Sequence, residues 1–129
     1  MKISDVARET GVAAKTIRYY ESIELIPPAA RQSNGYRAYR EADVSALRFI
    51  SRARTLGFSL DEIRDLLALW QDKGRASADV KRLAVDHIRS IEQRISELET
   101  VKNTLIDLTH RCHGDDRPDC PILEDLARL

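Results

Sequence analysis

Apolar runs of transmembrane length are absent from this sequence, and residues 1–20 lack the apolar core of a secretory signal. We therefore expect a cytoplasmic protein that does not enter a membrane. Aromatic residues make up only 5% of the 129 positions. The chain is thus expected to build a small helical core and to gain further burial by oligomerisation.

Cysteine is scarce, since Cys112 and Cys120 are the only two in the sequence. In a reducing compartment such a pair is more typical of a metal or redox site than of a structural disulfide. The sequence also lacks a nucleophile–base constellation, a Gly-rich phosphate loop and an HExxH-type pattern. These absences argue against an enzyme.

The net charge of zero conceals an uneven distribution. Residues 1–58 carry ten Lys and Arg against six Asp and Glu, whereas residues 59–129 carry eleven against fifteen. A basic first half joined to an acidic second half indicates a polyanionic partner for the first half only.

Two short helices are expected within residues 1–22. Ser4 is placed to cap the first, Gly11 to end it in the left-handed region, and residues 14–22 to form the second. Two helices joined by such a turn are typical of a helix-turn-helix. The second helix carries residue types that reach phosphates and base edges in a major groove, namely Lys15, Thr16, Arg18 and Tyr19.

Residues 25–40 predict a β-hairpin, because Asn34-Gly35 is a strong hairpin-turn dipeptide. Tyr36 and Arg37 follow this turn, and a ribbon with arginines and tyrosines near its tip is typical of a DNA-binding wing. Two helices complete the predicted domain, residues 1–70.

The first of these two helices is expected over residues 41–56, with Arg54 on its flank for contacts with the DNA backbone. Its buried stripe is predicted to contain Val44, Leu47, Ile50, Ala53 and Leu56. Ser59 opens a capping box for the next helix, whose apolar face is expected to include Trp70.

A polar linker over residues 71–76 precedes a long helix over residues 77–111, which Ser77 is placed to cap. Apolar residues recur along this helix at spacings of three and four through about four heptads. A lone helix of this length would leave its apolar stripe in water. The pattern therefore predicts a coiled-coil homodimer.

Residues 112–129 are predicted to form a loop with a thiol at each end, followed by a short helix that begins at Pro121. The loop between the cysteines contains turn formers and three aspartates, which are hard ligands better suited to turns and caps than to a soft metal ion. The fold class expected for the whole chain is mainly α.

The order of these parts resembles the MerR family of transcription activators. The resemblance rests on four segments and covers nearly the whole chain: Ile3-Ser-Asp-Val-Ala7, Thr16-Ile-Arg-Tyr-Tyr-Glu21, Asn34-Gly-Tyr-Arg-Ala-Tyr39 and Ala53-Arg-Thr-Leu-Gly-Phe-Ser-Leu60. Within the family, Ser77-Ala-Asp-Val-Lys81 and the Cys112–Cys120 loop look like those of copper-responsive members. The resemblance implies an antiparallel homodimer on double-stranded promoter DNA that distorts the DNA for RNA polymerase when it binds metal.

Two thiolates suit a soft ion, whereas zinc normally takes at least three protein ligands. Cys112 and Cys120 are therefore expected to hold one Cu(I), Ag(I) or Au(I) per protomer, with Hg(II) not excluded by coordination number alone. In related sensors of divalent ions, the resemblance implies a cysteine at the position of Ser77, so this serine would withhold a third sulfur. An imidazole from His110 or His113 would instead admit Zn(II) or Cu(II).

Other functions stay open at this point. The two cysteines would also serve a thiol–disulfide redox switch on the same DNA-binding half. A copper chaperone is a different class, disfavoured by Lys15, Arg18, Arg37 and the wing. Sensing of an organic ligand is disfavoured because related drug sensors carry a separate ligand domain.

Overall fold

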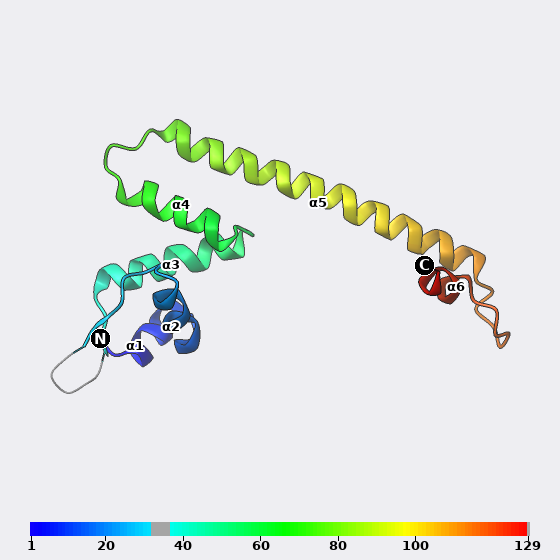
Figure 1. Cartoon of the computed structure of the whole chain (residues 1–129), viewed down its shortest axis with the longest axis horizontal. Helices are drawn as coiled ribbons and strands as arrows, with labels where there is room; N and C mark the ends of the chain where they lie inside the picture. The colour runs from blue at the N-terminus through cyan, green and yellow to red at the C-terminus, as the bar shows by residue number, and fades with distance from the viewer. Residues whose placement is uncertain (32–36, 129) are drawn as a thin grey trace. The chain divides into compact units, whose positions relative to one another are not determined.

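The structure of this chain, a computed structural model, describes residues 1–31 and 37–128. Figure 1 shows its elements in the order α1 (Ile3–Thr10), α2 (Ala14–Ser22), β1 (Ala30–Arg31), β2 (Arg37–Ala38), α3 (Glu41–Thr55), α4 (Leu60–Gln71), α5 (Ser77–Arg111) and α6 (Pro121–Ala127). The chain divides into two compact units, Met1–Leu83 and Ala84–Leu129. The predicted mainly helical class is confirmed.

The first two helices meet in a tight turn, as predicted. Gly11 adopts a φ of 74°, so α1 ends in a left-handed glycine cap. The Thr10 hydroxyl donates to the Val6 carbonyl at 2.8 Å and accepts the Val12 N–H at 3.2 Å, which ties the turn back onto α1. The second helix occupies the predicted residues 14–22.

The start of α1 differs from the prediction. The helix begins at Ile3 with Lys2 in the N-cap position, so Ser4 lies inside the first turn rather than before it. The Asp5 carboxylate accepts the Lys2 N–H at 3.3 Å. An aspartate inside the helix therefore satisfies the backbone donor at the N-cap, and a serine cap is not needed.

The base of the wing is a two-stranded antiparallel ribbon. Its register pairs Ala30 with Ala38 and Arg31 with Arg37. The predicted turn at Asn34-Gly35 and the predicted DNA contact Tyr36 lie outside the described residues. Directly after β2, the Tyr39 N–H donates to the Met1 carbonyl at 2.9 Å, so the ribbon is fixed to the segment that precedes α1.

One apolar core holds the first unit together. Its fully buried side chains come from four helices and from the segment after α2: Val6, Ile17, Ile26, Val44, Leu47, Ile50 and Ile63. The predicted α3 stripe is confirmed from Val44 to Ala53, but Leu56 is 50% exposed. The helix ends at Thr55, so Leu56 no longer follows the helical spacing that would bury it.

Helix α4 begins with the predicted capping box. The Ser59 hydroxyl accepts the Glu62 N–H at 3.2 Å, and the Glu62 carboxylate accepts the Ser59 N–H at 2.9 Å. Trp70 does not lie in the core as expected, because it remains 43% exposed. Its ring stacks on Phe49 of α3 with the centroids 4.6 Å apart.

Helix α5 runs through 35 residues over the predicted range. Ser77 is its first residue, one position inside the cap expected of it. In the unit Ala84–Leu129, the apolar stripe of α5 is exposed in the single chain, at Ile88, Ile91, Ile95, Leu98, Val101 and Leu105. Within the described part of the chain, α5 and the other helices are too short or too polar to cross a membrane.

Replacing Gly11 with alanine should lower the free energy of unfolding by about 1–2 kcal/mol, because a Cβ is disfavoured in the left-handed region. Crowding is not the reason, since the added Cβ would meet nothing within 4 Å. Urea denaturation followed by circular dichroism measures the change. Gly74→Ala is the matched control, with an expected change below about 0.5 kcal/mol. An equal loss at both glycines would contradict the conformational explanation.

Candidate metal centre and nucleic-acid interface

Both cysteines are attached to helix ends through their backbones. The Cys112 N–H donates to the Leu108 carbonyl at 3.1 Å and so extends the last turn of α5. Cys120 is the N-cap of α6, and its carbonyl accepts the Glu124 N–H at 3.0 Å. The loop over residues 112–120 therefore begins and ends on hydrogen-bonded backbone.

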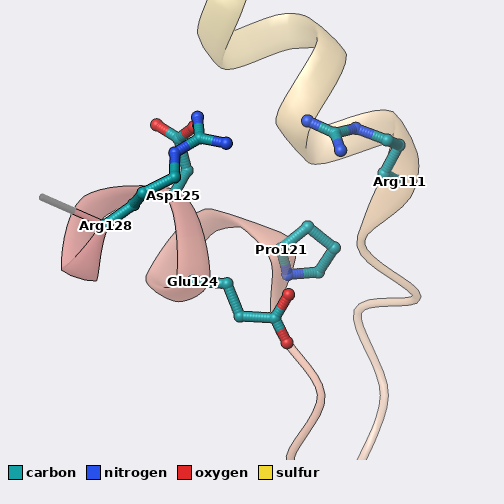
Figure 2. A pocket seen from close by; sticks show the side chains of 5 residues that line it. All are labelled: Arg111, Pro121, Glu124, Asp125 and Arg128. Atoms are coloured by element: carbon teal, nitrogen blue, oxygen red, sulfur yellow. The ribbon is translucent and has the colours of Figure 1, made fainter.

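The two ends of this loop lie side by side. Arg111 precedes the first cysteine, Pro121 follows the second, and both line one pocket of about 280 Å³. Figure 2 shows the last turn of α5 facing α6 across this pocket, with Arg111 on one side and Pro121 and Glu124 on the other. Each cysteine is thus one residue away from a side chain that lines the same space.

The pocket itself is balanced in charge. Its two arginines pair with aspartates of their own helices, Arg111 with Asp107 at 3.2 Å and Arg128 with Asp125 at 2.7 Å. Glu124 in the first turn of α6 adds a further carboxylate to the lining. We therefore consider the two thiols, and not the side chains that line the pocket, as the candidate ligands of this region.

The thiols of Cys112 and Cys120 are free and partly exposed. Across residues 1–31 and 37–128, no three His, Cys, Asp or Glu side chains gather closely enough to hold a metal ion. Neither His110 nor His113 therefore joins the two cysteines in a three-ligand group within one chain. Two thiols are soft ligands, and their chemistry fits a soft ion of low coordination number.

Inside the loop, Asp115 serves the turn, as expected for these aspartates. Its carboxylate accepts the Arg117 N–H at 2.9 Å and pairs with the Arg117 Nε at 2.9 Å. Gly114 has a φ of 66°, a conformation that favours glycine. The other two aspartates, Asp116 and Asp119, are exposed.

Helix α2 has one buried and one exposed face, as the sequence predicts. Ile17 is fully buried, and Tyr20 is nearly so. On the other face Lys15, Arg18 and Tyr19 are exposed, Tyr19 to 52%. The side chains suited to a major groove are therefore free of the core.

Thr16 and Arg54 come from different helices and line one open pocket of about 450 Å³. The remaining walls come from the α1–α2 turn, α2 and α3, at Gly11, Val12, Ala13, Tyr20, Ser51 and Thr55. The Arg54 Nη1 also donates to the Phe58 carbonyl at 3.3 Å, which limits where this guanidinium points. Two of the predicted DNA contacts thus share one surface. The side chain of Arg37, like Tyr36, lies outside the described residues.

Two groups of residues near this surface were not predicted. Ser51 and Thr55 join Arg54 in the pocket, and the polar positions between the apolar residues of α3 were the available signal. Arg64 of α4 donates to carbonyls at the end of α2, at Ile23 and Glu24. No local pattern marks Arg64, because its partners lie 40 and 41 residues away.

Comparison with known proteins relates the whole chain to one family. The family described as "MerR HTH family regulatory protein" matches residues 1–70, and "MerR, DNA binding" matches residues 44–108. The chain is 51% identical over 127 residues to heavy metal-dependent transcription regulator 2 of Rhizobium meliloti (strain 1021), covering 98% of this chain and 86% of that protein. It is 45% identical over 127 residues to the regulator CueR of Escherichia coli O6:H1, covering 98% and 94%.

Among solved structures, the regulator PbrR691 from Ralstonia metallidurans CH34, crystallised with lead(II), matches with a TM-score of 0.85. The identity is 33%, and the match covers 98% of this chain and 99% of that one. The resemblance read from the sequence segments and the fold class expected with it are both confirmed.

The exposure of the two cysteines leads to a thiol prediction. Because both are free and partly exposed, a native anaerobic sample should titrate two thiols per chain with a disulfide reagent, and Cys112→Ser should titrate one. Denaturant should raise the rate of reaction but not the number of thiols. A native count below two, restored only by denaturant, would contradict the accessibility of the site.

Proposed function

We propose that this chain, which belongs to the MerR family of helix-turn-helix transcriptional regulators, is a metal-responsive activator of promoter DNA. Regulators of this family bind DNA and are not enzymes. The activating ion is Cu(I), or Ag(I) or Au(I), one per protomer at Cys112 and Cys120. The response switches on copper efflux and detoxification genes.

The observation that carries this proposal is the pair of free thiols at the adjoining ends of one loop. Thiolate sulfur is a soft ligand that selects soft ions. Structural and catalytic zinc sites use three or four protein ligands, and the described residues of one chain contain no group of three such ligands. A monovalent d¹⁰ ion is the class for which two thiolates are sufficient.

The names of similar proteins support a metal ion as the effector, but they differ in the ion. One similar protein is named as heavy metal-dependent, another is CueR, and PbrR691 was solved with lead(II). Ser77 favours a monovalent ion. The family resemblance implies a cysteine thiolate at this position in sensors of divalent ions, whereas a serine hydroxyl is a poor ligand for soft metals. When bound, the ion supplies two metal–sulfur bonds that close the loop over residues 112–120.

The exposed stripe of α5 supports a homodimer. Six large apolar side chains along this helix are 42–61% exposed in the single chain. Burial of apolar surface is worth about 25 cal/mol per Å², so pairing with a second α5 would stabilise the protein. The family resemblance adds that the two helices run antiparallel.

On DNA, α2 is the element suited to a major groove. Lys15, Arg18 and Tyr19 would reach base edges and phosphates from its exposed face, with Thr16 and Arg54 beside its first turn. Tyr36 and Arg37 of the wing would contact the flanking backbone. The family resemblance implies that the metal-bound dimer distorts the promoter so that RNA polymerase uses it. Promoter DNA as the target implies a cytoplasmic location.

In vitro transcription from the chain's own promoter, with each free metal concentration buffered, tests the effector. Cu(I), Ag(I) or Au(I) should activate at lower free concentration than Zn(II). Cys112→Ser should abolish activation and the binding of one Cu(I) per chain. Its affinity for operator DNA should change less than about twofold, because Cys112 is not among the proposed DNA contacts. His113→Ala, a loop neighbour with no assigned ligand role, is the matched control and should respond normally.

Activation by Zn(II) at the lower concentration would contradict the monovalent ion. Loss of DNA binding in Cys112→Ser would instead give the loop a structural role. The redox alternative has its own signature: peroxide would activate the metal-free protein and remove both free thiols. That outcome would replace the metal proposal.

The dimer proposal predicts the effect of a charge on the stripe. Leu98, 61% exposed in one chain, should lie in the interface. Leu98→Glu should therefore raise the dimer dissociation constant at least tenfold, or about 1.4 kcal/mol, because burying an unpaired charge costs more than burying a neutral polar group. Sedimentation equilibrium measures it. Asn103→Glu places the same charge on α5 away from the stripe and should leave the dimer intact. Equal behaviour of the two variants would count against the stripe as interface.

A further inference from the structure

The C-terminal end of α2 is closed by an unusual turn. The Glu24 N–H donates to the Glu21 carbonyl at 3.1 Å, and the Leu25 N–H donates to the Tyr20 carbonyl at 2.9 Å. This pair of bonds is a Schellman motif, in which the residue after the C-cap adopts the left-handed conformation. Glycine normally occupies that position, but here it is Glu24, with a φ of 59°.

Glu24 is the one non-glycine residue with a positive φ in the described part of the chain. A side chain in this region is strained, and such a conformation persists only where the surroundings hold it. The buried side chain of Leu25 holds one side of the turn, since Leu25 is only 8% exposed. The other side is held from a distant helix.

Arg64 of α4 provides that hold. Its Nη1 donates to the Glu24 carbonyl at 3.0 Å and its Nη2 donates to the Ile23 carbonyl at 2.8 Å. Both acceptors lie at the C-terminal end of α2, where carbonyls lack helical partners and carry the negative end of the helix dipole. The last turn of α2 contains no basic residue of its own. The compensating charge therefore comes from α4.

Helix α4 is a firm support for this arginine. Ile63 is fully buried and Leu67 is 5% exposed, so the face of α4 beside Arg64 is anchored in the core. The planar guanidinium binds two carbonyls in a fixed fork, which fixes direction as well as distance. This fork therefore links the end of α2 to α4.

We infer that Arg64 is a positioning residue for DNA binding: it fixes the C-terminal end of α2 to α4 and thereby sets the orientation in which α2 presents Lys15, Arg18 and Tyr19. The inference rests on the proposed function of α2 as the groove-binding helix. Arg64 acts through α2 and is not assigned a contact with DNA.

The test uses the full-length chain and a duplex that the wild-type protein selects from a random-sequence library. Arg64→Ala should raise the dissociation constant at least about fivefold, the lower end of common coupling between separate sites. The slope of log affinity against log salt concentration should stay unchanged, because no phosphate contact is removed. Lys73→Ala, which removes an exposed positive charge just after α4, is the matched control and should bind within about twofold of wild type.

The double variant Arg64→Ala/Glu24→Gly separates positioning from support of a strained turn. Glycine relieves the strain at position 24, so the melting temperature of the double variant should be higher than that of Arg64→Ala. Its DNA affinity should remain as weak as that of Arg64→Ala, because the link to α4 is still missing. Glu24→Gly alone, which keeps the arginine fork, should bind like the wild type.

Recovery of wild-type affinity in the double variant would overturn the inference, since Arg64 would then only support the turn. A salt slope reduced by about one in Arg64→Ala would also overturn it, by making Arg64 a phosphate contact. An equal loss of DNA affinity in Lys73→Ala would also overturn it, because the effect would then come from the total positive charge and not from the position of α2. Failure of the wild-type protein to select any duplex would overturn the proposed function itself, whereas normal binding by Arg64→Ala would overturn this inference alone.

Discussion

The burial of Ile17 and Tyr20 is the constraint on which the DNA-binding half depends. Helix α2 has only nine residues, too few to be stable alone in water. It is helical because one face packs into the core made by α1, α3 and α4. The same packing turns Lys15, Arg18 and Tyr19 outward. The exposed face of α2 is therefore a consequence of the core, and on the proposed function the core residues determine DNA contact as much as the exposed ones do.

The second unit differs from the first, because the apolar stripe of α5 is not buried in a core of the same chain. Along most of the unit the large side chains of this stripe are exposed. Leu108 is the exception at 2% exposed, and it lies near the C-terminal end of α5. Figure 2 shows α6 beside this end of α5. On the proposed function, a partner covers the middle of α5, while the chain itself surrounds its end. Cys112 directly follows this end of α5, and Cys120 directly precedes α6.

Local signals in the sequence predicted most of this architecture. The Gly11 turn, the Ser59 capping box, Pro121 at the start of α6 and the range of α5 depend on neighbours within a few residues, and the structure has them in place. The exceptions have equally local causes. Ser4 has the residue type of a cap, but the Asp5 carboxylate accepts the N-cap N–H instead. Leu56 continues the apolar spacing of α3, but the helix ends at Thr55.

What the sequence did not indicate depends on residues that are distant along the chain. The strained Glu24 turn and its Arg64 fork join positions about 40 residues apart, and no periodicity reports such a contact. The meeting of Thr16 and Arg54 on one surface is of the same kind. The scarcity and spacing of the cysteines are visible in the sequence, whereas no local pattern indicates that Arg111 and Pro121 line one pocket.

The attachment of each cysteine to a helix end has a consequence for affinity. Cys112 continues the hydrogen bonds of α5 and Cys120 begins those of α6. On the proposed function, each thiol is therefore carried by ordered backbone, which lowers the entropy cost of closing the loop around an ion. The second sulfur then acts at a high effective concentration once the first has bound. On the proposed function, the strength of a two-ligand chelate in this position depends on the helix ends that carry the thiols and on the turn between them, where Gly114 and the Asp115–Arg117 pair fix the backbone.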